Sequence, residues 1–404
     1  MSKFPPVNEQ MDLIRRGVEE IISEDELVKK LEIAEKSSEP LVIKLGCDPS
    51  RPDLHIGHAV VLRKLRHFQD LGHQSVLVVG DFTALIGDPS EQNKTRPQLT
   101  IEQVNEFSET YVQQAELILD LKTLKIVRNG DWLGIMNFHN VINLASHYTV
   151  ARMLERDDFE KRYQSETPIF IHEFLYPLAQ AMDSVELKAD VELGGTDQKF
   201  NLLVGRDLQK DHGQVPQVVI TTPLLEGTDG IQKMSKSYDN YIGITDSPSE
   251  IYGRTMSISD DLILRYFEFA TDVDSVMLKD VQNKLSDGKT NPRDLKRQLS
   301  REIVSLYHGE ESALEAEAEF DRIFIESDVP DEMDEWTAGA VEVLILSMMC
   351  DSGLVSSKRE ARRLIEQGAV TIDGEKVSDI TTNVNVSSSV VLKVGKRRFI
   401  RVTA

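Results

Sequence analysis

Cysteine is scarce in this sequence, and long apolar runs are absent. Only Cys47 and Cys350 occur among 404 residues, and they form no cluster with metal-ligand spacing. Two thiols in so long a chain are typical of reduced cysteines rather than of a disulfide framework. No segment approaches the roughly 18 apolar residues of a membrane-spanning helix, and the N-terminus MSKFPPVNEQ has no apolar stretch of signal-peptide type. We therefore expect a cytoplasmic protein that contacts no membrane and binds no metal through cysteine.

Charge is unevenly distributed along the chain. The net charge of −22 argues against a protein coated in nucleic acid. Residues 353–404, however, contain ten Lys or Arg and five Asp or Glu, a balance of +5 that leaves −27 on the rest. A basic segment on an acidic protein is typical of a small part that meets a polyanion, although a solvated surface would look the same.

The length and the apolar pattern indicate two or three domains, one of them of the α/β class. A short apolar run predicts a strand at 41–46, followed by a loop at 47–54. Helical spacing of apolar residues predicts a helix at 57–72, and a second buried strand follows at 75–81. Strand, helix and strand in succession form a βαβ unit, so we expect a parallel sheet that binds ligands at the carboxyl ends of its strands.

Further elements are expected along the rest of the chain. Segments 12–37, 101–165 and 167–187 are predicted to be helical, 218–222 a strand, and 248–325 helical again from Pro248.

The C-terminal part has its own pattern. The acidic segment 328–336 is interpreted as a linker, and two short helices are expected from about 340. The pair Asp373-Gly374 then predicts a β-hairpin.

The first motif with chemical meaning is His55-Ile56-Gly57-His58. It lies where the loop after the first strand becomes a helix, and backbone N–H groups and the helix dipole favour a phosphate chain there. Gly57 leaves room for a nucleotide to approach the backbone. An isolated pair of histidines is more often just surface, so this motif alone decides nothing.

The second motif is Lys233-Met234-Ser235-Lys236-Ser237, in the loop after the late strand. Two lysines on a loop can close over a triphosphate and neutralise charge as pyrophosphate leaves. Alone, such a loop is more often a solvated turn.

The two motifs in this order are not expected by chance, and together they resemble the paired signatures of class I aminoacyl-tRNA synthetases. The resemblance covers essentially the whole chain. It implies a doubly wound, Rossmann-like catalytic domain, then a helical domain and a small α+β RNA-binding domain. The expected boundaries are 1–244 with a helical insertion near 101–165, 245–330 and 338–404.

Three further stretches look like the tyrosine-specific branch of this family. Tyr176, Gln180 and Asp183 have helical spacing i, i+4 and i+7 and so share one helix face. A glycine-hinged loop is expected at 194–198. The stretch 80–90 offers a carboxylate at a strand's end.

The resemblance implies roles for individual residues. Asp88, Tyr176 and Gln180 would hold the ammonium group of tyrosine, Asp183 its phenol, and Gln198 would lie near its carboxylate. Gly46, Asp48 and Ser50 would lie along the adenylate, with Asp197 near the ribose. His55, Gly57 and His58 would contact the phosphates. Lys233 and Lys236 would act on pyrophosphate, with Met234, Ser235 and Ser237 in the same ATP-binding loop.

Lys44 departs from the better-known branch of the family, which has a phenol-binding tyrosine at this position. The sequence leaves open whether Lys44 bonds the phenol itself or pairs with Asp183. We include it among the tyrosine-binding residues.

The basic tail resembles an S-four-type RNA-binding domain. The resemblance implies a helix that turns four basic side chains toward phosphates: Lys358, Arg359, Arg362 and Arg363. Such contacts add affinity for RNA without reading bases.

The implied activity is formation of tyrosyl-adenylate from L-tyrosine and ATP, then transfer of the tyrosyl group to tRNA(Tyr). Mg²⁺ would arrive with ATP, no tightly bound cofactor is expected, and the family resemblance implies a homodimer. The alternatives are a tryptophan-specific enzyme, a catalytically silent RNA-binding relative and a small-molecule adenylyltransferase. The tryptophan-specific enzyme is disfavoured by the stretches around 176–183 and 194–201. The silent relative is disfavoured by the intact motifs, and the adenylyltransferase by the basic tail.

Overall fold

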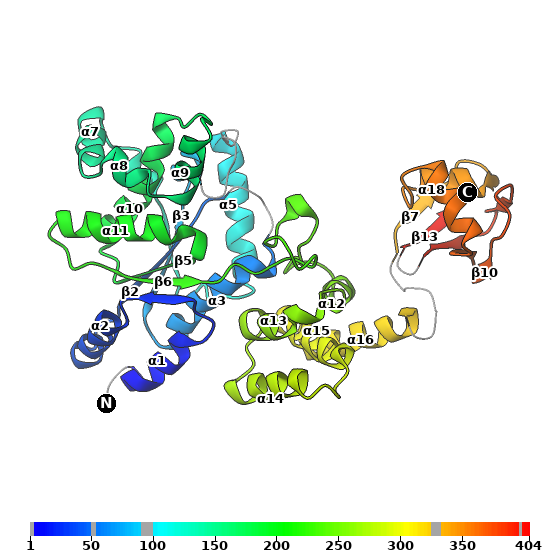
Figure 1. Cartoon of the computed structure of the whole chain (residues 1–404), viewed down its shortest axis with the longest axis horizontal. Helices are drawn as coiled ribbons and strands as arrows, with labels where there is room; N and C mark the ends of the chain where they lie inside the picture. The colour runs from blue at the N-terminus through cyan, green and yellow to red at the C-terminus, as the bar shows by residue number, and fades with distance from the viewer. Residues whose placement is uncertain (1–3, 50–53, 90–99, 325–332, 396–397) are drawn as a thin grey trace. The chain divides into compact units, whose positions relative to one another are not determined.

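The computed structural model describes residues 4–49, 54–89, 100–324, 333–395 and 398–404. The chain divides into two compact units, Met1–Gly309 and Glu310–Ala404 (Figure 1). Among the described residues, no helix is both long enough and apolar enough to cross a bilayer. The domain boundaries expected at 244, 330 and 338 stay predictions.

A mixed sheet forms the centre of unit 1, Met1–Gly309. Within the described residues it has six strands in the order β1-β6-β5-β2-β3-β4, parallel throughout except for β1 at one edge. The Rossmann-like parallel sheet expected from the sequence is confirmed. In chain order the strands are β1 (Glu20–Ile22), β2 (Val42–Cys47), β3 (Gln74–Val79), β4 (Lys125–Arg128), β5 (Val191–Gly195) and β6 (Val218–Thr222).

The strand order reverses direction at β2. From β2 the chain crosses to β3 on one side, and β5 later enters on the other side. Such a switch point opens a crevice at the carboxyl ends of the two strands, where doubly wound sheets bind their ligands. The segment that follows β2 therefore lies at the expected site.

Helices surround this sheet, and α3, α10 and α11 pack directly against its strands (Figure 1). The core face of α3 buries Leu62, Leu65 and Phe68, in keeping with the helical spacing of its apolar residues. The helices of unit 1 are α1 (Val7–Arg15), α2 (Glu24–Ser37), α3 (Ile56–Asp70), α4 (Thr83–Ile86), α5 (Ile101–Ala115), α6 (Gly130–Leu133), α7 (Phe138–Ser146), α8 (Val150–Met153), α9 (Asp157–Gln164), α10 (Leu175–Leu187), α11 (Lys199–Asp211), α12 (Pro248–Met256), α13 (Ile263–Ala270), α14 (Ser275–Ser286) and α15 (Pro292–His308). Short 3-10 turns lie at η1 (Ile171–Phe174), η2 (Thr196–Gln198), η3 (Lys236–Tyr238) and η4 (Asp260–Leu262).

Three short strands lie where the sequence predicts helix or loop. β1 interrupts the helices expected at 12–37, and β4 interrupts those expected at 101–165. The glycine-hinged loop expected from 194 is wrong, because β5 includes both glycines and the 3-10 turn η2 follows. Strands of three to five residues show too little periodicity to be read from sequence, and only their pairing in the sheet stabilises them.

Of two helix starts expected from the sequence, one differs and one is confirmed. The helix expected at 167–187 begins at Leu175 as α10, after the separate turn η1. The helix expected at Pro248 is confirmed, with proline in the first turn of α12 and the Ser247 side chain as its N-cap.

Unit 2, Glu310–Ala404, has its own apolar core, to which the buried Met348, Ile365 and Leu392 belong. Strand β8 precedes the two helices expected from about 340, because it pairs with the distant β11. Two strands flank the predicted hairpin at Asp373-Gly374, which is confirmed with φ values of 47° and 83°. The elements are α16 (Glu310–Phe324), β7 (Glu335–Thr337), β8 (Glu342–Leu344), α17 (Ile345–Asp351), α18 (Lys358–Glu366), β9 (Val370–Ile372), β10 (Glu375–Lys376), β11 (Asn383–Asn385), β12 (Val390–Val394) and β13 (Arg398–Thr403).

Candidate active site

The histidine motif forms the start of α3. His55 is the N-cap residue, and its ring stacks on that of His58 with centroids 3.8 Å apart. A side chain at Gly57 would place a Cβ atom 3.0 Å from Nδ1 of His55, so only glycine fits without displacing the ring. The motif therefore presents two imidazoles at the positive end of a 15-residue helix.

The lysine motif lies directly against the histidine motif. The backbone N–H of Ile56 donates to the carbonyl of Ile242 at 2.9 Å, and His55 pairs with Gly243 as an isolated β-bridge. A Cβ atom at Gly57 would lie 3.5 Å from Cβ of Met234. Two motifs that are far apart in sequence therefore form one continuous surface.

The two lysines of the second motif face this surface. Burial, followed by the charges of Lys233 and Lys236, lowers the pKa of His58 to about 4, so its imidazole is neutral at pH 7. Burial also lowers the pKa of Lys233, while Asp88 opposes the shift. The ammonium of Lys236 lies 5.0 Å from the ring centroid of Tyr241. The arrangement concentrates positive charge beside a helix N-terminus, as an oligophosphate requires.

Asn240 holds the lysine loop in shape, and nothing in the sequence signals this role. Its side-chain oxygen accepts a hydrogen bond from the backbone of Ser235 at 2.7 Å. Its amide nitrogen donates to Asp229 at 3.0 Å and to the carbonyl of Lys233 at 3.1 Å. The side chain of the buried Asn240 thus supplies hydrogen bonds to backbone groups of this loop, as a helix or strand would do elsewhere.

Asp48 lies just beyond β2, at the switch point. Its carboxylate accepts hydrogen bonds from Thr83 at 2.7 Å and from the hydroxyl of Tyr176 at 2.9 Å. Burial raises the pKa of Asp48 to about 7, and the charges of Asp88 and Asp183 add to the rise. The carboxylates predicted from separate stretches therefore lie close enough to interact.

The sequence suggested that Asp88 lies at the end of a strand. In the structure it follows the short helix α4 instead. Its carboxylate accepts hydrogen bonds from Arg156 at 3.2 Å and from the side chain of Gln198 at 2.8 Å. Arg156 also donates to Asn201 at 3.0 Å. The buried guanidinium of Arg156, which sequence reasoning missed, thus compensates one of the cleft's negative charges.

Asp183 is 2% exposed and points from α10 toward the segment after β4. The indole N–H of Trp132 donates to one of its oxygens at 2.9 Å, and Asn129 donates to the other at 3.3 Å. Burial raises its pKa to about 7, against the opposing effect of the Lys44 ammonium and these hydrogen bonds. The sequence did not predict these roles of Trp132 and Asn129, because neither residue belongs to a recognisable motif.

Lys44 has neither of the roles considered for it from sequence. Its fully buried ammonium contacts Glu192 at 2.8 Å, Ser184 Oγ at 2.8 Å and the carbonyl of Gln180 at 2.9 Å. These acceptors use the three ammonium protons, which leaves none for a phenol in the described structure. The expectation that Lys44 pairs with Asp183 or bonds the phenol is therefore replaced by pairing with Glu192.

The remaining predicted positions lie in β2, in η2, in the lysine motif or outside the described residues. Gly46 lies in β2, and Asp197 lies in η2 with its pKa raised by burial and by Asp88. Met234 is buried, and Ser235 caps η3 by accepting from the backbone of Ser237 at 3.3 Å. Ser50 lies outside the described residues.

The predicted RNA-binding residues all lie on α18 of unit 2. The opposite face of this helix is buried through Ala361 and Ile365, so its basic side chains are exposed. They are Lys358, Arg359, Arg362 and Arg363.

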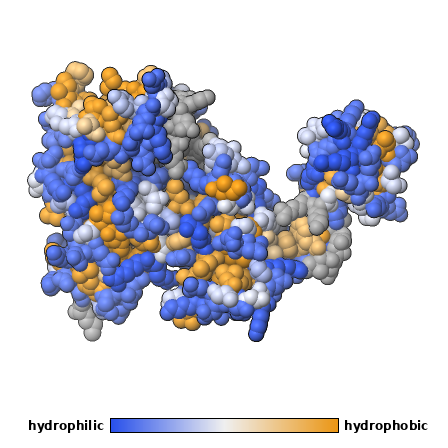
Figure 2. All heavy atoms as spheres, in the orientation of Figure 1, coloured by the Kyte–Doolittle hydropathy of each residue, from blue (hydrophilic) through white to orange (hydrophobic). Residues whose placement is uncertain are grey.

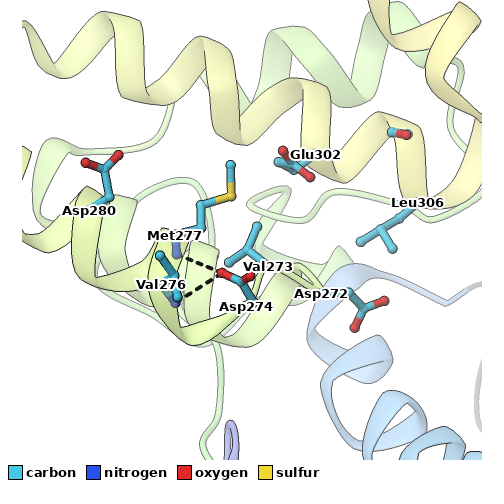
Figure 3. Close-up of a pocket in the computed structure, with 9 residues that line it drawn as sticks. Asp272, Val273, Asp274, Val276, Met277, Asp280, Glu302 and Leu306 are labelled. Carbon is cyan, nitrogen blue, oxygen red and sulfur yellow. Dashed lines mark hydrogen bonds between the residues drawn. The ribbon is translucent and has the colours of Figure 1, made fainter.

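A hollow of about 730 Å³ lies elsewhere in unit 1, beside α14 and α15 (Figure 3). Among its lining residues are Asp272, Asp274, Asp280 and Glu302. Three of these already have partners, since Asp272 pairs with Arg63, Asp280 pairs with Lys284, and Asp274 accepts from the backbone of α14. An acidic wall disfavours the approach of phosphate.

Comparison with known protein families gives two matches that together span most of the chain. Residues 36–325 match the family described as tRNA synthetases class I (W and Y). Residues 325–402 match the Tyrosine--tRNA ligase SYY-like C-terminal domain.

The family description covers enzymes for tryptophan (W) and for tyrosine (Y), and the individual relatives carry the name of the tyrosine enzyme. The Tyrosine--tRNA ligase of Salinibacter ruber is 54% identical over 404 residues, which cover 99% of this chain and 97% of the relative. That of Chlorobaculum tepidum is 53% identical over 400 residues, or 99% and 98% of the two chains. The solved tyrosyl-tRNA synthetase of Archaeoglobus fulgidus in complex with L-tyrosine is similar in fold, with a TM-score of 0.63 and 24% identity over 77% of this chain and all of that one.

The raised pKa of Asp183 predicts how stability depends on pH. Its pKa rises from 3.8 to about 7 on folding, so between these values the folded state holds a proton that the unfolded state has lost. The free energy of unfolding therefore decreases as pH rises through this window, by at most about 1.4 kcal/mol per pH unit for one proton. Asp183→Asn removes this group, and we expect a shallower decrease between pH 5 and pH 7.

Urea unfolding followed by Trp132 fluorescence measures this slope. Trp336 is the other tryptophan of the chain, so Trp336→Phe in both proteins leaves Trp132 as the reporter for unit 1. Equal slopes for the two proteins would contradict the pKa shift. Asp48, with its pKa also at about 7, continues to contribute in both.

Proposed function

Because the chain belongs to the tyrosine–tRNA ligases of the class I tRNA synthetases, we propose a role for each side chain of the cleft in the two steps of tyrosine charging. The chain is an aminoacyl-tRNA synthetase that uses ATP to charge tRNA(Tyr) with tyrosine through tyrosyl-adenylate. The assignment of the pocket rests on the buried carboxylate of Asp183, which accepts hydrogen bonds from the indole of Trp132 and the side-chain amide of Asn129.

Asp183 takes the phenolic hydroxyl of tyrosine. A carboxylate accepts hydrogen bonds through several lone pairs, so the donors Trp132 and Asn129 leave room for a third. Phenylalanine would leave this buried carboxylate without the phenol donor, which costs free energy that tyrosine does not lose. Selectivity thus comes from an acceptor that needs a hydroxyl.

Asp88, Tyr176 and Gln180 hold the ammonium group of tyrosine. The hydroxyl of Tyr176 donates to Asp48 and so turns its lone pairs toward a donor. The charge on Asp88 complements an ammonium. Gln198, bonded to Asp88 at 2.8 Å, lies on the same side and orients the substrate carboxylate.

The nucleotide extends from the switch point to the helix terminus. Gly46, Asp48 and Ser50 lie along the adenylate, and Asp197 bonds the ribose. Gly46 is exposed, and a Cβ atom there would meet nothing within 4 Å, which agrees with an open surface at the end of β2.

The first step joins the substrate carboxylate to the α-phosphorus of ATP. A carboxylate oxygen attacks phosphorus, and the bond to the bridging oxygen of pyrophosphate breaks. His55 and His58 donate to the phosphates, and Lys233 and Lys236 neutralise the charge that develops on pyrophosphate. Met234 packs the lysine loop against Gly57, while Ser235 and Ser237 shape its turn. Mg²⁺ enters as part of the ATP substrate.

The second step transfers the tyrosyl group to RNA. A ribose hydroxyl of the terminal adenosine of tRNA attacks the carbonyl carbon, and AMP leaves. The basic face of α18 binds tRNA phosphates, which positions the RNA without reading its bases.

The protein acts in the cytoplasm as a homodimer. Large apolar side chains are exposed around α6 to α8 of unit 1, where Ile135 is 81% and Phe138 80% exposed. Ile142 and Val150 are also exposed, and Figure 2 shows apolar surface over this region at the upper left. A second copy that covers this surface would remove it from water.

Asp183→Ala tests the recognition of the phenol. The variant loses a charged hydrogen bond to tyrosine, so we expect tyrosine-dependent ATP–pyrophosphate exchange to fall by roughly a hundredfold or more. An unchanged melting temperature shows that the fold is intact. Normal exchange in a folded variant would refute the assignment.

Replacing the basic residues of α18 tests the RNA-binding face. An alanine variant at Lys358, Arg359, Arg362 and Arg363 should keep pyrophosphate exchange and raise the KM for tRNA in charging. Each lost phosphate contact should also reduce the salt dependence of tRNA binding, by about 0.7–0.9 in the slope of log K against log salt. If both the KM and the slope match the unmodified protein, α18 does not bind tRNA.

Phe138→Glu tests the dimer surface. A buried charge at the interface is unfavourable, so light scattering should give the mass of two chains for the unmodified protein and of one for the variant. Val276→Glu is the control, because Val276 is 73% exposed on α14 and away from this surface. A variant that remains dimeric would show that the interface lies elsewhere.

A further inference from the structure

A buried ion pair joins the two central strands beneath the tyrosine pocket. Lys44 on β2 and Glu192 on β5 are register partners in the parallel pairing, so both side chains extend from the same face of the sheet. Their exposed fractions are 0% and 1%. Neither residue has a step in the reaction described above, and a buried pair of charges calls for an explanation.

The carboxylate of Glu192 is bonded through both of its oxygens. Oε1 accepts from Lys44 at 2.8 Å and from the side-chain amide of Gln180 at 3.3 Å. Oε2 accepts from Ser184 at 3.0 Å and from Gln217. Lys44 in turn donates to the carbonyl of Gln180 at 2.9 Å. The pair therefore contacts Gln180 at two points, the main chain and the side chain.

These contacts decide which end of the Gln180 amide faces the pocket. An ionised carboxylate can only accept, so the NH₂ group of the amide must turn toward Glu192. The oxygen then points away from the pair. This Oε1 atom is buried, and it has no hydrogen-bond partner among the described residues. A buried acceptor without a donor is unfavourable unless a ligand supplies one.

We propose that Glu192, neutralised by Lys44, is a positioning residue that turns the Gln180 amide so that its oxygen accepts from the ammonium group of tyrosine. The inference rests on the proposed ammonium-binding role of Gln180. It also accounts for lysine at position 44: the pair needs a cation there, and a phenol-binding side chain would leave Glu192 uncompensated. The pair contacts Gln180 and acts on the substrate only through this residue.

Glu192→Gln removes the constraint, because an amide can present either an acceptor or a donor to Gln180. We expect the affinity for L-tyrosine, measured by equilibrium dialysis, to fall about ten- to hundredfold, the range for a hydrogen bond to a charged group. The affinity for 3-(4-hydroxyphenyl)propanoate, which lacks the ammonium group, should stay within about threefold of that of the unmodified protein. A merely structural role would weaken both ligands alike, and that result would overturn the proposal, as would unchanged tyrosine affinity.

Ser184→Ala is the matched control. It removes a hydrogen bond to the other oxygen of the same carboxylate and one acceptor of the Lys44 ammonium, and it leaves both contacts with Gln180 in place. Its affinity for tyrosine should remain within about threefold of that of the unmodified protein. A fall as large as that of Glu192→Gln would show that any damage to the network suffices, and would overturn the proposal.

Two further variants keep the result interpretable. If the unpaired Lys44 prevents Glu192→Gln from folding, Lys44→Met combined with Glu192→Gln removes both charges, and the same two ligands are measured with the same expectations. Gln180→Ala distinguishes the ammonium-binding role of Gln180 from its positioning by Glu192. Unchanged tyrosine affinity in Gln180→Ala refutes the role of Gln180 itself, and with it the proposal. Weakened affinity there but not in Glu192→Gln refutes the positioning by Glu192 alone.

Discussion

The parallel pairing of β2 with β5 is the interaction on which the cleft depends. It creates the switch point of the sheet and places Lys44 directly beside Glu192. It also fixes where the segment after β2 meets the turn after β5, so that Asp48 and Asp197 border the same crevice. The buried Lys44–Glu192 pair thus lies on two neighbouring strands, and Tyr176, Gln180 and Asp183 lie on the helix α10, so regular elements rather than loops hold these side chains.

Compensation of buried charge explains most of the other contacts in the cleft. Asp88 is paired with Arg156, Glu192 with Lys44, and Asp183 receives two neutral donors. Burial raises the pKa of Asp183 to about 7, and the charge of Lys44 and the two neutral donors oppose this rise only in part. A carboxylate held in this way keeps its capacity to accept from a substrate hydroxyl.

The region around the start of α3 is organised differently. It contains a helix terminus, two stacked imidazoles and two lysines, and a buried Asn240 supports the loop that carries the lysines. Positive charge thus gathers beside the start of α3, while Asp48, Asp88 and Asp183 interact with one another nearby. The hollow beside α14 is lined by acidic and apolar side chains and by Ser305 instead.

The sequence by itself determined the parts of the protein that are encoded in short contiguous segments. The βαβ unit and the Asp373-Gly374 hairpin follow from local pattern, because periodicity and turn chemistry act over a few residues. The motifs at 55–58 and 233–237 and the basic face of α18 follow from the family resemblance that these short segments carry. Only the tertiary structure decided the short strands β1, β4 and β5 and the partners of the buried charges. Trp132 meets Asp183 across 51 residues, and Lys44 meets the carbonyl of Gln180 across 136. Such partners are selected by the cost of burying an unpaired charge, which becomes apparent only once the chain is folded.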